Sequence, residues 1–133
     1  MFQTINIKDH SNENIIHIDC TLRDGGYYNN WEFEKELINN YLKAISSTSI
    51  NYVEIGFRNL SNDNFKGALA FSSDKYLQTL NLPKNIDLGV MINSSQLKMR
   101  DNYLDALREL FPNHSKETPV KLVRIACDLD TLE

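Results

Sequence analysis

Four short apolar runs, separated by longer amphipathic stretches, define the pattern of this chain. The runs are rich in β-branched residues and mostly do not alternate with polar residues, which is typical of buried strands in a parallel sheet. They cover Ile15–Cys20, Tyr52–Phe57, Ile86–Ile92 and Val120–Cys127. The pattern therefore predicts an α/β fold with parallel strands.

Between these strands, apolar residues recur at the spacing of one helix face. The predicted helices are Trp31–Ser46, Asp74–Leu80 and a segment that begins at Ser94 or Ser95 and ends at Phe111. Asn30 is the expected N-cap of the first, since asparagine side chains accept hydrogen bonds from the free N–H groups of a helix start. The chain is thus expected to alternate strands with helices.

This alternation predicts about four βα units of about 30–35 residues each, the spacing of a TIM (β/α)8 barrel of ~250 residues. The expected fold is the N-terminal half of such a barrel. The competing architecture is an open doubly wound sheet, which four strands can complete more easily.

Composition excludes several classes of partner. The chain has 133 residues, a net charge of −4 and 41% hydrophobic residues, so we expect a globular protein that binds neither nucleic acid nor an anionic membrane. No apolar stretch approaches the ~20 residues of a membrane span, and Met1–Thr4 do not resemble the start of a secretion signal. We expect a cytoplasmic location, with Cys20 and Cys127 as buried free thiols.

The end of the first predicted strand carries the candidate chemistry. It is followed by Thr21-Leu22-Arg23-Asp24-Gly25-Gly26. Arg23 can hold a carboxylate or an enolate in a fork of hydrogen bonds, and Asp24 offers hard oxygen to Mg²⁺ or Mn²⁺. Neighbouring residues at a strand end point to different sides, so the two need not neutralise each other. The alternative is a surface ion pair beside a glycine turn.

Three segments, Ile18–Gly26, Tyr52–Phe57 and Val90–Ile92, resemble the metal-dependent aldolase and lyase superfamily. That superfamily includes 4-hydroxy-2-oxovalerate aldolase, hydroxymethylglutaryl-CoA lyase, and homocitrate and isopropylmalate synthases. The resemblance extends from about Ile15 to Cys127, and Val123–Ala126 places it closest to the aldolase branch. It implies that residues 1–133 are a partial TIM-barrel aldolase catalytic domain, the N-terminal part of a longer enzyme.

The activity that the resemblance implies is a carbon–carbon lyase reaction. A divalent metal, Mn²⁺ or Mg²⁺, would polarise a small 4-hydroxy-2-oxoacid, whose (retro-)aldol cleavage gives pyruvate and an aldehyde. By the same resemblance, Asp24 is the metal ligand and Arg23 stabilises the enolate. The alternatives are a condensing transferase of the homocitrate synthase type, which releases CoA, and a non-catalytic assembly module.

Two departures from the superfamily pattern affect this interpretation. The superfamily takes further metal ligands from a His-x-His pair, whereas this chain has only His10, His17 and His114, so its metal site is expected to be incomplete and the chain alone inactive. The aldolases that it resembles place a catalytic histidine at the position of Tyr27. Tyr27 or Tyr28 could relay a proton, but a phenol is a poor base at neutral pH.

Three other charged residues, Glu54, Arg58 and Arg124, each have two alternative roles. Glu54 lies inside an apolar strand, so it should pair with Arg23 or Arg58, either as part of the catalytic site or only to order the strand ends. Arg58 is expected to meet a substrate carboxylate or water, and Arg124 to face the barrel mouth or form a salt bridge. His17 is expected to be buried and hydrogen-bonded.

Because a half barrel has exposed edge strands, we also expect a homo-oligomer.

Overall fold

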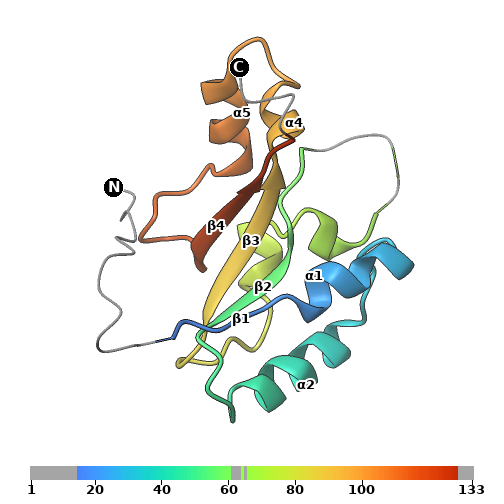
Figure 1. The fold of residues 1–133 in the computed structure, drawn as a ribbon, viewed down its shortest axis with the longest axis vertical. Helices are drawn as coiled ribbons and strands as arrows, with labels where there is room; N and C mark the ends of the chain where they lie inside the picture. Colours follow the sequence, from blue (N-terminus) through green and yellow to red (C-terminus); the bar gives the residue numbers. More distant parts are fainter. Residues whose placement is uncertain (1–14, 61–63, 65, 129–133) are drawn as a thin grey trace.

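The computed structural model describes residues 15–60, 64 and 66–128. Their four strands form one sheet in the order β1-β2-β3-β4, and every neighbouring pair is parallel (Figure 1). The strands are β1 Ile18–Asp19, β2 Tyr52–Phe57, β3 Asp87–Asn93 and β4 Val120–Ala126. The predicted α/β fold with parallel strands is confirmed.

The strand order follows the chain without a reversal. A doubly wound sheet reverses its strand order at the point where its ligand binds, while a βα barrel adds each strand beside the previous one. The observed order is therefore the order of four consecutive barrel strands.

Helices of one to three turns occupy the connections between the strands. They are α1 Thr21–Gly25, η1 Gly26–Tyr28, α2 Lys35–Ile45, η2 Ala68–Ala70, α3 Asp74–Leu77, α4 Ser94–Leu97 and α5 Tyr103–Leu110. The helix expected from Ser94 or Ser95 to Phe111 is divided in two, since α5 begins afresh where the Asn102 side chain accepts a hydrogen bond from the backbone N–H of Leu104.

The first long helix starts later than predicted. Asn30 is not its N-cap, because Asn30 and Trp31 have φ of 56° and 60°, in the left-handed region that a helix cannot use. Glu34 is the N-cap instead, and α2 begins at Lys35. Burial of the Trp31 side chain accompanies this unusual backbone and ends the helical pattern on its N-terminal side.

The first strand is shorter than predicted, and the His17 prediction is wrong. Only Ile18 and Asp19 pair with β2, and Ile15 and Ile16 are exposed at the edge of the described sheet. His17 is exposed as well, although its backbone N–H donates to the side chain of Asn51.

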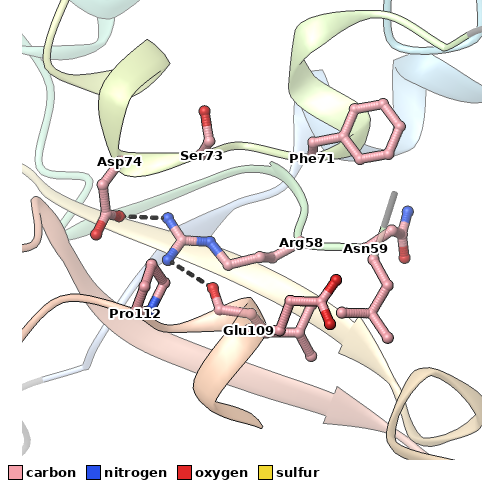
Figure 2. Close-up of a pocket in the computed structure, with 9 residues that line it drawn as sticks. Arg58, Asn59, Phe71, Ser73, Asp74, Glu109 and Pro112 are labelled. Atoms are coloured by element: carbon pink, nitrogen blue, oxygen red, sulfur yellow. Dashed lines mark hydrogen bonds and ion pairs between the residues drawn. The ribbon is translucent and has the colours of Figure 1, made fainter. Parts of the chain in front are cut away.

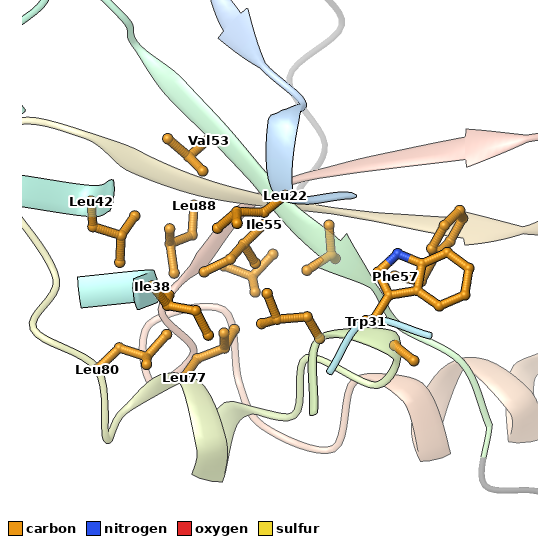
Figure 3. Packing of buried hydrophobic residues seen from close by; sticks show 14 of the residues in the cluster. Leu22, Trp31, Ile38, Leu42, Val53, Ile55, Phe57, Leu77, Leu80 and Leu88 are labelled. Atoms are coloured by element: carbon orange, nitrogen blue, oxygen red, sulfur yellow. The ribbon is translucent and has the colours of Figure 1, made fainter. Parts of the chain in front are cut away.

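The main core lies between the sheet and the helices on one of its faces (Figure 3). Side chains that alternate along β2 and β3 point into it, where they pack with residues of α2 and α3. Among its fully or almost fully buried members are Val53, Ile55, Leu88, Val90, Ile38, Leu42 and Leu77. A smaller cluster of Leu60, Ile92, Ala106 and Leu110 fixes α5 against the sheet. Glu54 lies between Val53 and Ile55, so its side chain leaves β2 on the opposite face.

Arg58 is not solvated, as one of its two predicted roles required, because it forms a buried ion pair with Asp74 (Figure 2). Its Nη2 donates to Asp74 Oδ1 and to the carbonyl oxygen of Ser72, both at 2.6 Å, and its guanidinium lies 5.0 Å from the ring centre of Phe111. Asp74 also accepts hydrogen bonds from the side chains of Asn113 and Thr118. This pair joins the end of β2 to α3 and to the segment before β4.

Within the described parts of the chain, the helices are all too short or too polar to cross a membrane.

Asp74→Ala should lower the free energy of unfolding by about 3–5 kcal/mol, because it leaves the Arg58 charge buried without its partner. Asp105→Ala, at an exposed i,i+3 pair with Arg108, should change it by less than about 1 kcal/mol. Urea unfolding followed by circular dichroism measures both. Equal losses in the two variants would contradict a structural role for the buried pair.

The Arg58–Asp74 pair should also make the free energy of unfolding depend on pH in the acid range. Burial alone would raise the pKa of Asp74, but hydrogen bonds from Arg58, Asn113 and Thr118 outweigh burial and lower it. The stabilisation is therefore complete above the unfolded-state pKa of about 3.9 and is lost as pH falls through the lower folded-state pKa. Urea midpoints measured between about pH 5 and pH 2.5 should fall more steeply in the parent than in Asp74→Asn.

Candidate functional site

The candidate site is built around Glu54, whose side chain is completely buried on β2. Its Oε1 accepts a hydrogen bond from Arg23 Nε at 2.7 Å and one from Arg124 Nη2 at 2.9 Å. Its Oε2 accepts a third from Arg124 Nε at 2.5 Å. The Glu54 carboxylate on β2 thus connects α1, which follows β1, with β4. Of the two predicted partners of Glu54, Arg23 is confirmed and Arg58 is wrong.

The strand between Glu54 and Arg124 carries a glycine in register with Glu54. Strand β3 lies between β2 and β4, and its residue in register with Glu54 is Gly89. A Cβ at Gly89 would lie 3.6 Å from the Glu54 Cα and 3.4 Å from the Leu122 side chain. Both are ordinary van der Waals distances, so the space beside Glu54 would also admit a Cβ at this position. Of the two options predicted for Arg124, the structure shows the salt bridge.

The two arginines keep Glu54 ionised. Burial alone would raise the pKa of this carboxyl group, but hydrogen bonds from Arg124 and then Arg23 outweigh it, so the net shift is downward. The same carboxylate raises the pKa of both guanidinium groups above their ordinary value. The cluster therefore holds two permanent positive charges around one buried negative charge.

Asp24 lies beside Arg23, and the expectation that the two point apart is wrong. The ion pair between Arg23 Nη1 and Asp24 Oδ1 forms because both residues lie on helix α1 and not at a strand end, where side chains alternate. The Asp24 side chain remains 61% exposed. It is thus the more accessible of the two carboxylates that contact Arg23.

A full metal-binding set is not gathered in the part of the chain that the structure describes, where no three His, Cys, Asp or Glu side chains come together as ligands. His17 and His114 are both exposed, and His10 lies outside the described residues. Of the two described carboxylates that contact Arg23, Asp24 is the one exposed at the edge of the site.

The two cysteines are free, as predicted, but neither is fully buried, so that part of the prediction is wrong. Cys127 is exposed, whereas Cys20 is partly buried with its Sγ 3.9 Å from Arg124 Nη2. Burial and then the charge of Glu54 raise the pKa of the Cys20 thiol, against the weaker opposite effect of the two arginines. Cys20 is therefore a neutral thiol and a poor nucleophile at neutral pH.

A hydrogen bond from Tyr41 on α2 anchors the start of this site. Its hydroxyl donates to Asp19 at the end of β1, and Asp19 also accepts hydrogen bonds from the backbone N–H and the hydroxyl of Thr21. Burial and this bond raise the pKa of Tyr41, which keeps its hydroxyl protonated as a donor. These contacts fix the turn that leads from β1 into α1 and Arg23.

Trp31 holds the backbone of Arg23 in place, a role that the sequence pattern did not indicate. Its indole Nε1 donates to the carbonyl oxygen of Arg23 at 2.8 Å, and its ring packs edge-on against Phe57. Only the structure shows that Gly26 and Gly67, two glycines far apart in the chain, both lie against Trp31.

The Tyr27 ring packs against the same two aromatic side chains. Its centre lies 4.9 Å from that of Trp31 and 6.1 Å from that of Phe57. It remains 63% exposed, and its neighbour Tyr28 is 97% exposed. The structure thus pairs Arg23 with both Asp24 and Glu54, and it places Tyr27 against Trp31 and Phe57.

A separate pocket of about 190 Å³ lies between α3 and the end of α5, against Arg58 and Phe71 (Figure 2). Its charged residues are already paired, Arg58 with Asp74 and Glu109 with Arg100. We therefore place the candidate site at the Glu54 cluster.

Comparisons with known proteins support a coarse assignment. No protein-family model matches the chain, and no curated protein matches it. A solved structure, described as "the N-terminal domain of a putative aldolase from Bacteroides vulgatus", superposes with a TM-score of 0.63 at 28% sequence identity. The match covers 84% of this chain and 35% of that one, so this chain spans about a third of its length. The chain is an α/β domain that is similar to the N-terminal domain of an aldolase-like protein.

Proposed function

We propose that this chain contributes the arginine side of a carbon–carbon lyase site, which cleaves a 4-hydroxy-2-oxoacid to pyruvate and an aldehyde. The observation that carries the proposal is the fixed position of Arg23 on α1, the helix that follows β1, where Glu54 holds its side chain and Trp31 its carbonyl oxygen. Catalytic groups of parallel βα folds lie at the C-terminal ends of the strands. The similarity to an aldolase-like domain supports the same reaction class.

Arg23 has hydrogen-bonding capacity left for a substrate. Its Nε is used by Glu54 and one N–H of Nη1 by Asp24, and the guanidinium also contacts the Cys20 thiol, so three of its five N–H donors are engaged and two remain for a ligand. In the cleavage, the bond between C3 and C4 breaks and its electron pair forms the enolate of pyruvate. A guanidinium that is already held in place stabilises that negative charge without reorganising, which is the usual source of large catalytic effects.

The divalent metal of the proposal does not fit the described residues alone. Mg²⁺ and Mn²⁺ favour several oxygen ligands, and this site offers the single exposed carboxylate of Asp24, itself paired with Arg23. We assign no step to the metal. Under the proposal, the remaining ligands and the general base come from residues beyond those described, and Tyr27 is not assigned as the base.

The reaction is tested in a polypeptide that extends this chain through the remaining βα units. Pyruvate release from 4-hydroxy-2-oxopentanoate, followed with lactate dehydrogenase and NADH, should be present in that protein and absent from residues 1–133. A parallel assay with acetyl-CoA and a 2-oxoacid detects thiol release. Thiol release without pyruvate release would assign the site to a condensing transferase and reject the lyase.

Arg23→Gln should weaken the binding of oxalate, a planar mimic of the pyruvate enolate, by about tenfold or more, because a charge-assisted hydrogen bond contributes about 1.5–3 kcal/mol. The fold should survive, since Glu54 keeps its two bonds from Arg124. Chemical-shift titration of the labelled chain measures the dissociation constant. The matched control is Arg100→Gln, at an exposed pair with Glu109. An unchanged constant in Arg23→Gln would remove Arg23 from the site.

The chain should bind Mn²⁺ only weakly, with a dissociation constant above about 1 mM, because one carboxylate leaves most of the coordination sphere to water. Isothermal titration calorimetry on the parent and on Asp24→Asn measures this, and the variant should bind still less. Micromolar binding that survives in Asp24→Asn would show a metal site elsewhere in the chain.

We further propose that the chain forms a homo-oligomer through its edge strands. Strands β1 and β4 are the edges of the described sheet, and Ile125 on β4 is 53% exposed. Ile125→Lys should shift the assembly toward monomer in sedimentation velocity at micromolar concentration. Leu37→Lys on α2, at an equally exposed residue, is the control and should leave the assembly unchanged. A parent chain that sediments as a monomer would contradict the proposal.

A further inference from the structure

An aromatic surface lies directly beside Arg23. Trp31 and Phe57 meet edge to face with ring centres 5.3 Å apart, at one end of the core (Figure 3). Tyr27 packs edge-on against both of them, and most of its surface stays open to solvent. We call Tyr27, Trp31 and Phe57 the aromatic shelf. The guanidinium carbon of Arg23 lies 5.8 Å from the ring centre of Phe57, so the shelf and the proposed enolate-binding cation are in contact.

The backbone around the aromatic shelf has unfavourable local geometry. Trp31 has φ of 60°, which is rare for a bulky residue and follows another left-handed residue, Asn30. A Cβ at Gly26 would lie 1.9 Å from the Trp31 ring, and one at Gly67 would lie 2.2 Å from the Trp31 carbonyl oxygen. Backbone strain of this kind is concentrated at functional sites, where the surroundings hold it.

Two cationic side chains, those of Lys66 and Arg23, lie next to the aromatic shelf. Lys66 Nζ lies 5.3 Å from the centre of the Trp31 ring, and Arg23 lies over Phe57, so cations occupy positions next to both supporting rings. Tyr27 is the member of the shelf that is neither covered by a cation nor buried. Arg23 and Tyr27 thus both lie against the Phe57 ring, so a ligand bound at the exposed edge of Arg23 would lie close to Tyr27.

We propose that Tyr27 is a specificity-determining residue, and that the aromatic shelf binds a ring in the tail of the 2-oxoacid substrate. The inference rests on the proposed function, because Arg23 would hold the charged end of the same molecule. Aromatic rings favour partners with a flat or apolar face, which aromatic groups and sugar rings share. Tyr27 acts through its ring face and not through its hydroxyl, which separates this role from proton relay.

The chain contains a single tryptophan, so Trp31 fluorescence reports on ligands that reach the shelf. Excited at 295 nm, the full chain is titrated with pyruvate, with 2-oxo-4-phenylbutanoate, and with two ring compounds that lack the oxoacid, 3-phenyl-1-propanol and methyl β-D-glucopyranoside. The ring-bearing oxoacid should bind about threefold to tenfold more tightly than pyruvate, the range expected for one added aromatic contact. The two ring compounds distinguish an aromatic tail from a sugar tail.

Three variants assign the effect to the Tyr27 ring. Tyr27→Ala should abolish the preference for the ring-bearing oxoacid, whereas Tyr27→Phe, which keeps the ring and removes the hydroxyl, should retain it. Tyr28→Ala is the matched control, because its parent side chain is 97% exposed and it should also retain the preference. Tyr27 is itself exposed, so its replacement should leave the fold intact, and circular dichroism checks this.

The outcomes separate this inference from the proposed function. Equal binding of pyruvate and 2-oxo-4-phenylbutanoate, unchanged in Tyr27→Ala, would overturn the shelf and leave the lyase proposal standing. Loss of the preference in Tyr27→Phe would overturn the ring contact and favour a role for the hydroxyl. If neither oxoacid binds while a ring compound binds in a Tyr27-dependent way, the proposed function fails and the ring site stands. If no probe binds, both are rejected.

Discussion

The buried charge of Glu54 is the constraint on which the candidate site depends. A carboxylate with no exposed surface costs too much free energy unless hydrogen-bonded cations surround it. Arg23 and Arg124 meet that requirement from the two edges of the sheet, one from α1 after β1 and the other from β4. The interaction therefore fixes the position of Arg23 and makes it dependent on a strand about a hundred residues later in the chain.

The chain uses the pairing of arginine with a carboxylate in two different ways. Arg58 and Asp74 are both buried, and further hydrogen bonds from Asn113 and Thr118 complete the pair, so it connects the helical layer to the sheet. The Glu54 cluster instead keeps part of its cationic surface accessible through Arg124 and beside the exposed Asp24. The first arrangement stabilises the fold, and the second leaves a fixed positive charge available to a ligand.

The surroundings of Arg23 are rigid on one side and open on the other. Trp31 holds the Arg23 carbonyl oxygen from within the core, and Tyr41 holds the preceding turn through Asp19. Tyr27 and Asp24 then border the site on its solvent side. This combination of a supported cation and an accessible, partly aromatic rim is consistent with binding of a small anionic molecule that carries a less polar tail.

Local sequence determined the strands and the general fold. Tyr52–Phe57 was predicted with its observed limits, and the third and fourth strands were predicted to within one residue at each end, because a buried strand needs an apolar run of its own. The position of Arg23 and Asp24 directly after β1 was also determined locally. The superfamily resemblance supplied their proposed roles, and the structure leaves those roles as proposals.

Tertiary structure alone decided how these groups are paired. The link from Glu54 to Arg124 spans β3 and depends on the parallel register of β2, β3 and β4, which the spacing along the chain does not reveal. The start of α2 was missed because burial of Trp31 accompanies a left-handed backbone that overrides helical periodicity. The sequence specifies short-range structure through the period of its apolar residues, whereas partners across a sheet are chosen by packing in three dimensions.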